Sequence, residues 1–147
     1  MRTRLPFILI SLFLLSIVLL TGCSKDDEFH NKLRLLDREM VESKLLQEGF
    51  SFEEKDLFDI YRLDVEGLRT QTAFELAGNE SSLYMYIFES EEEQFQGRKQ
   101  LERQTIALSY KPTFYDVNNV LLVYMAGYPE EPYNEQIDEL ARNLLKK

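Results

Sequence analysis

The chain has 147 residues, a formal net charge of −9 and a single cysteine, and 44% of its residues are hydrophobic. This length suits one packed domain, and the apolar content argues against a globally disordered chain. Phosphate backbones would repel so acidic a chain, so we expect no nucleic-acid partner, and one cysteine excludes an internal disulfide.

The amino-terminal residues have the pattern of a secretory signal peptide. Arg2 and Arg4 give a basic start, and residues 5–20 follow as an almost unbroken apolar run. As a helix rising about 1.5 Å per residue, the run would span roughly 24 Å, which is short of the ~30 Å hydrocarbon core of a membrane. We therefore expect residues 1–22 to be a signal peptide that is removed.

The apolar run ends in Leu20-Thr21-Gly22-Cys23, which resembles the lipobox of bacterial lipoproteins. The resemblance implies cleavage between Gly22 and Cys23 and a diacylglycerol group, with acyl chains such as palmitate, on the sulfur of Cys23. Because each buried methylene contributes about 0.8 kcal/mol, two acyl chains anchor a protein firmly where one binds marginally. The implied location is the extracytoplasmic face of the cell membrane. The alternatives are an ordinary signal peptide with an incidental cysteine and an uncleaved membrane anchor.

A short tether is expected after the cleavage site. Residues 23–30 are mostly polar and charged, as in a solvated linker. His30 is the only histidine of the chain, and a metal ligand there would need His or Cys companions that the sequence does not supply. We expect His30 to lie on the surface, and we expect no metal site and no cofactor.

An amphipathic helix, as one piece or two, is the next expected element. Gly49 is a typical residue for its end. The apolar residues that recur at helical spacing before it are Phe29, Leu33, Leu36, Met40, Val41 and Leu45. Since the charges of this segment are mixed rather than basic, we expect it to pack against the domain rather than lie on the membrane.

Short β-strands are predicted in the middle of the chain. Residues 57–63 and 70–76 have strand-type patterns, and a turn cluster at 77–82 leads into residues 83–88. The run 83–88 is apolar on both faces, which is typical of a central strand. Residues 70–76 alternate between apolar and polar, so we place them nearer an edge.

A second helix is predicted over about residues 91–107. The acidic run that begins it, after Ser90, has the residue types of a carboxylate site, but Ser90 and Glu93 have the spacing of a helix capping box. We therefore interpret this run as a helix start. Gly97 should weaken the helix slightly. Its expected apolar sector contains Phe95, Leu101, Ile106 and Leu108.

The last third of the chain is predicted to contain further β-structure and a closing helix. Residues 114–117 and 120–125 are strand-like, and Asn118-Asn119 between them form either a tight hairpin turn or a bulge. After a loop at 127–132, apolar residues again recur at helical spacing. They are Tyr133, Ile137, Leu140, Ala141 and Leu144.

These elements predict a single α+β domain over residues 31–147, with a mainly antiparallel sheet covered by helices on one face. The runs 83–88 and 120–125 should be central in the sheet. No catalytic residue set is predicted, because a serine hydrolase would need a histidine base and a nucleophile motif that the sequence lacks. Asp56, Asp59 and Asp64 do not have the alternate-residue spacing of a calcium loop.

One group of residues raises the question of a binding surface. Tyr84, Tyr86 and Tyr124 alternate along predicted strands, and an open aromatic strand face would stack on sugars or grip peptides. The competing interpretation, which we favour, is that helices cover these side chains as part of the core.

Residues 84–90 and 119–124 resemble passages of small, uncharacterised lipoproteins of Gram-positive spore-forming bacteria. The resemblance implies an envelope with one membrane and no particular activity. Two functional hypotheses follow. The leading one is a non-catalytic interaction module that binds an envelope protein or an exported peptide. The alternative is a small envelope hydrolase or ligand-binding accessory that uses carboxylates and tyrosines.

Overall fold

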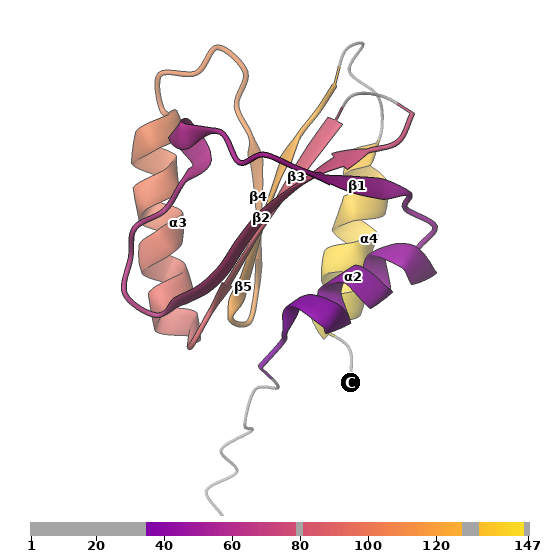
Figure 1. Cartoon of the computed structure of the whole chain (residues 1–147), viewed down its shortest axis with the longest axis horizontal. Helices are drawn as coiled ribbons and strands as arrows, with labels where there is room; N and C mark the ends of the chain where they lie inside the picture. Colours follow the sequence, from indigo (N-terminus) through magenta and orange to yellow (C-terminus); the bar gives the residue numbers. More distant parts are fainter. Residues whose placement is uncertain (1–34, 79–80, 128–132, 146–147) are drawn as a thin grey trace, which may run out of the picture. The chain divides into compact units, whose positions relative to one another are not determined.

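Five strands form one antiparallel sheet in this computed structural model, which describes residues 35–78, 81–127 and 133–145 (Figure 1). The order across the sheet is β1-β2-β3-β5-β4, and every neighbouring pair is antiparallel. The strands are β1 (Phe52–Lys55), β2 (Leu68–Leu76), β3 (Ser81–Phe88), β4 (Thr113–Val117) and β5 (Val120–Met125). The predicted α+β class and antiparallel sheet are therefore confirmed, with β3 in the centre and β2 beside edge strand β1.

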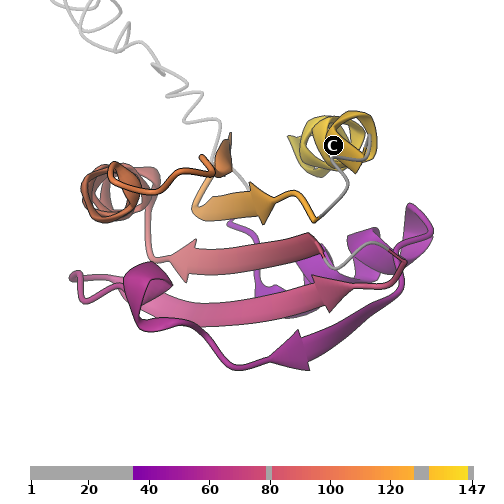
Figure 2. The same cartoon turned by 90° about the horizontal axis from the view of Figure 1, so that it is seen from above.

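Helices cover both faces of the sheet, so the expectation of one covered face was wrong. Helix α3 (Glu91–Thr105) packs on one face, and helices α2 (Arg38–Gln47) and α4 (Tyr133–Leu145) pack on the other (Figures 1 and 2). The physical reason lies in β3 and β5, whose side chains are apolar on both faces. Leu83 and Met85 join the core on the α2–α4 side, whereas Tyr84 and Tyr86 join the core on the α3 side.

Helix α2 begins and ends at recognisable capping residues. The side chain of Asp37 accepts a hydrogen bond from the amide of Met40 at 2.9 Å, and Gly49 has a positive φ of 85° just after the helix. The helix buries Val41 and Leu45. This confirms the predicted stop at Gly49. Residues 35–37 are not helical, so the alternative of one continuous helix from Phe29 was wrong, and a separate first piece at residues 29–33 lies outside the described residues.

The predicted N-terminal cap of α3 at Ser90 is confirmed, with the Glu93 carboxylate accepting from the Ser90 hydroxyl, but the buried stripe of this helix differs from the predicted one. Ser90 Oγ accepts from the amide of Glu93 at 3.3 Å. Phe95 and Ile106 are exposed, against the prediction. Gly97 is buried instead, and a Cβ there would lie 2.4 Å from Cζ of Phe88. The helix thus approaches the sheet through its glycine, and its buried residues are Gln94, Gly97, Leu101 and Thr105.

The predicted strand at residues 57–63 was wrong. The edge position belongs to β1, and residues 57–63 cross the α3 face with a short 3₁₀ turn, η1 (Asp59–Tyr61). The side chain of Gln71 replaces a strand partner there: its amide nitrogen donates to the carbonyl of Leu63 at 3.2 Å, and its oxygen accepts from the amide of Leu63 at 3.0 Å. The apolar residues of 57–63 are therefore buried or presented by a segment that crosses the sheet rather than by a strand.

Asn118 and Asn119 form a hairpin turn between β4 and β5, which decides between the two alternatives of the sequence. Asn118 has a φ of 52°, the left-handed conformation that asparagine tolerates. Asn119 is fully buried, and its side chain bonds both the amide and the carbonyl of Leu36 and the carbonyl of Phe88. This turn therefore holds the start of the described chain against the sheet.

The closing helix α4 is confirmed. Ile137, Leu140, Ala141 and Leu144 are buried between this helix, the sheet and α2. None of the helices in the described ranges has both the length and the apolar character needed to cross a membrane.

Candidate functional site

The lipidation site predicted at Cys23, the cleavage position after Gly22, the tether and His30 all lie outside the described residues. The anchor therefore stays a prediction from the sequence. Within the described ranges, no group of three or more His, Cys, Asp or Glu side chains is placed to hold a metal ion.

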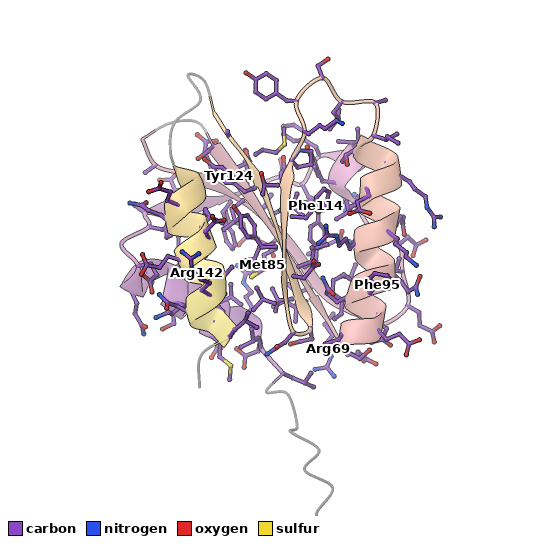
Figure 3. All side chains as sticks on the ribbon, turned by 180° about the vertical axis from the view of Figure 1, so that it is seen from behind. Arg69, Met85, Phe95, Phe114, Tyr124 and Arg142 are labelled. Carbon is purple, nitrogen blue, oxygen red and sulfur yellow. The ribbon has the colours of Figure 1, made fainter. Side chains whose placement is uncertain are left out.

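Tyr84, Tyr86 and Tyr124 do not form one surface. Tyr84 and Tyr86 lie on the α3 side of the sheet, whereas Tyr124 lies on the α2–α4 side with Met85 (Figure 3). Each is at most 2% exposed. The structure thus places all three in the core, which is the interpretation that the sequence favoured, and the open aromatic face is not observed.

Tyr84 nevertheless lines a hollow together with Tyr61, and Tyr86 supports Tyr61 from within the core. The rings of Tyr61 and Tyr84 are stacked with centroids 4.1 Å apart, and the Tyr86 hydroxyl donates to the carbonyl of Tyr61 at 2.6 Å. Burial, together with the nearby Tyr84, raises the pKa of Tyr61 to about 12. Burial also raises the pKa of Tyr84, although its hydrogen bond with Ser82 acts in the opposite direction. These tyrosines therefore stay neutral at physiological pH.

An open, mainly apolar hollow of about 490 Å³ lies beside this tyrosine stack. It occupies the end of the sheet where β3 begins and β5 ends. We call it the aromatic hollow, and its lining consists of Phe58, Ile60, Tyr61, Ser82, Tyr84, Leu108, Ser109, Tyr110, Met125 and Ala126. Phe58 is 60% exposed and Tyr110 48% exposed, so the rim presents large apolar side chains to solvent.

The rim also carries a cation. Lys55 Nζ donates to Ser82 Oγ at 2.6 Å and lies 5.8 Å from the centroid of the Phe58 ring. The carboxylate of Glu75 is 4.0 Å from this ammonium, and the Glu75 side chain is 57% exposed. The hollow therefore combines an apolar wall with the amino group of Lys55 and the hydroxyl of Ser82 at its edge.

The pair of Ser82 and Lys55 has the residue types of a serine–lysine hydrolase, but the arrangement fits binding better. A serine nucleophile must be open to its substrate, whereas Ser82 is only 8% exposed and lies within β3. Among the described residues, the lining of the hollow contains no Asp or Glu, the groups that the hydrolase hypothesis needs. The site can hold an apolar group beside a cation.

A second, smaller hollow of about 310 Å³ lies between α2 and α4. Lys44, Gln47 and Asn143 contribute to its lining, and Lys44 is paired with Glu48 at 3.0 Å. Its apolar area is small, so it is the weaker candidate.

Sequence reasoning missed the aromatic hollow because its parts come from distant segments. Residues 57–63 gave a signal in the sequence, an apolar run that was interpreted as a strand. Once these residues cross the sheet instead, Phe58 and Ile60 project beside it as an exposed pair.

No known protein family model, curated protein sequence or solved structure matches this chain. The structure shows a small α+β domain with an open apolar hollow, and arguments about its function depend on its own residues.

Proposed function

We propose that this chain is a lipid-anchored, non-catalytic interaction module that binds an apolar segment of an envelope protein or an exported peptide. The observation that carries the proposal is the aromatic hollow, which gathers exposed Phe58, Ile60 and Tyr110 around one cavity. Apolar side chains exposed together mark interaction sites, and aromatic residues are enriched at the centres of such sites.

The size and openness of the hollow support a polypeptide ligand. A volume of about 490 Å³ accommodates one or two large apolar side chains, and the exposed rim offers contact beyond the cavity itself. Fully burying such a side chain contributes roughly 1.5–3 kcal/mol, so two anchors contribute roughly 3–6 kcal/mol. Association also costs translational and rotational entropy, so the contacts of the ligand with the exposed rim are needed as well.

The anchor places this binding site at the membrane surface in our proposal. The lipid on Cys23 would hold the domain on the extracytoplasmic face, where exported peptides and envelope proteins pass. Changing Cys23→Ala should leave the precursor without lipid and uncut after Gly22, because the modification takes place on the thiol. Acylation of the mutant, measured by mass spectrometry, would disprove the anchor.

Site-specific photo-crosslinking in intact cells tests the binding site. A benzophenone amino acid replaces Phe58, at the hollow, or Phe95, which is similarly exposed at 50% but lies on α3 outside the lining. We expect a discrete adduct from position 58 that position 95 does not give, and we expect its yield to fall when Ile60→Ser is added. Equal adducts from both positions, or none from position 58, would contradict the proposal.

A further inference from the structure

We infer that the aromatic hollow takes the carboxyl terminus of a polypeptide whose last residue is apolar. The final side chain would enter the hollow, and the terminal carboxylate would bind the ammonium of Lys55. This inference rests on the proposed function and names the class of its ligand. The inference starts from the position of Lys55. This residue does not line the aromatic hollow, but its ammonium contacts Ser82 and the ring of Phe58, and both of these residues line the hollow.

The charge of Lys55 is only weakly compensated in the described structure. Its carboxylate neighbour Glu75 is 4.0 Å away and mostly exposed, so solvent screens the pair. Its hydrogen bond is to the neutral hydroxyl of Ser82. In a chain of net charge −9, a cation at the mouth of an apolar cavity marks the place where an anionic group is attracted rather than repelled.

A carboxylate at this position would gain two contacts. The ammonium has three donors, of which Ser82 takes one, and charge-assisted hydrogen bonds to a carboxylate are about twice as strong as neutral ones. The apolar walls beside Lys55 would also exclude water and strengthen the attraction. In the last residue of a polypeptide, the terminal carboxylate and the side chain are both bonded to the Cα atom. One residue can therefore place its carboxylate at Lys55 and its side chain in the hollow.

The open rim favours a polypeptide end over a free fatty acid, which has the same two chemical groups. Sites for small molecules enclose most of their ligand. Here Phe58 and Tyr110 are 60% and 48% exposed around an open hollow. The residues that precede the carboxyl terminus would cover these rim side chains, whereas a small ligand would leave them in water.

Peptide binding to the full chain in nanodiscs of neutral lipid tests the inference. The probes are fluorescent hexapeptides that end in leucine, phenylalanine or valine, each made with a free carboxylate and as the amide. Anisotropy titrations should show at least tenfold tighter binding of a free acid than of its amide. The variant Lys55→Met should remove this difference, and Lys55→Arg should keep it.

A matched control and the alternative outcomes make the test decisive. Lys99 also lies over an exposed ring, 4.2 Å from the centroid of Phe95, but outside the hollow. The variant Lys99→Met should therefore leave the difference in affinity between acids and amides unchanged. Equal binding of acids and amides that Phe58→Ser weakens would overturn the carboxylate inference and leave the proposed function. Binding of palmitate but of no peptide would overturn the polypeptide ligand, and no binding by any peptide would overturn both proposals.

Discussion

Replacing Asn119 should destabilise the domain strongly, although the residue lies in a turn. Its side chain makes three buried hydrogen bonds. The amide of Leu36 donates to Oδ1 at 2.7 Å, and Nδ2 donates to the carbonyls of Leu36 and Phe88, each at 2.9 Å. Asn119→Ala would leave three backbone groups without partners in a site that is fully buried.

The expected loss follows from these contacts. Each hydrogen bond contributes about 1 kcal/mol, and each buried backbone group left unpaired costs about 1–3 kcal/mol before relaxation or water entry, so we expect a loss of about 3–5 kcal/mol for Asn119→Ala. Urea denaturation followed by circular dichroism measures it. Asn118→Gly is the control, because glycine adopts the φ of 52° at that position without strain.

Asn119→Asp tests the direction of the hydrogen bonds. Its carboxylate would still accept from the amide of Leu36, but its second oxygen would face the carbonyls of Leu36 and Phe88. Burial and these carbonyls should raise the carboxyl pKa in the folded state, so the lost stability should partly return as the pH falls and the carboxyl can donate. If Asn119→Ala cost less than about 1 kcal/mol, or Asn119→Asp showed no recovery in acid, the proposed role of these bonds would be refuted.

Three further predictions concern the core. Gly97→Ala should cost about 1–3 kcal/mol because its Cβ would overlap the Phe88 ring, and Phe88→Leu in the same chain should reduce that cost in a double-mutant cycle. Leu140→Ala should lower stability by about 2–5 kcal/mol, and an unchanged denaturation midpoint would contradict the packing of α4. Because the pKa of Tyr61 rises from 10.0 to about 12 on folding, the stability that Tyr61 contributes should be fully present below about pH 10 and should fall by up to about 1.4 kcal/mol per pH unit above it. Tyr84, Tyr86 and Tyr115, whose pKa values burial also raises, should add to the same loss in alkali. Denaturation from pH 8 to 11.5 tests this sign.

Local sequence signals predicted the elements whose causes are local. The Ser90 hydroxyl and the glycine at position 49 fixed the ends of two helices through contacts within a few residues. The runs 83–88 and 120–125 were correctly placed in the sheet interior because side chains that are apolar on both faces need cover on both. That same pattern also implied helices on two faces, a consequence that the prediction of one covered face overlooked.

The elements that sequence reasoning missed have causes that are distant in the chain. The strand β1 is short and charged, as edge strands often are. It is a strand because it pairs with β2, so the propensities of its own residues did not predict it. Gly97 was interpreted as a weakness of its helix, whereas the ring of Phe88 makes a small residue necessary there. The position of the cation at the rim likewise depends on the hydrogen bond between Lys55 and Ser82, which are 27 positions apart in the chain.

The residues at which the described chain begins lie away from the proposed binding site. Leu36 belongs to the core of the α2–α4 face and is held at the β4–β5 turn by Asn119. The aromatic hollow lies on the α3 face, near Met125 at the other end of β5, and five steps of about 3.4 Å separate the ends of this strand by roughly 17 Å. A ligand can therefore occupy the hollow without displacing residues 35–37. Variants of Asn119 should consequently change the stability of the domain without changing peptide affinity under conditions where it is folded.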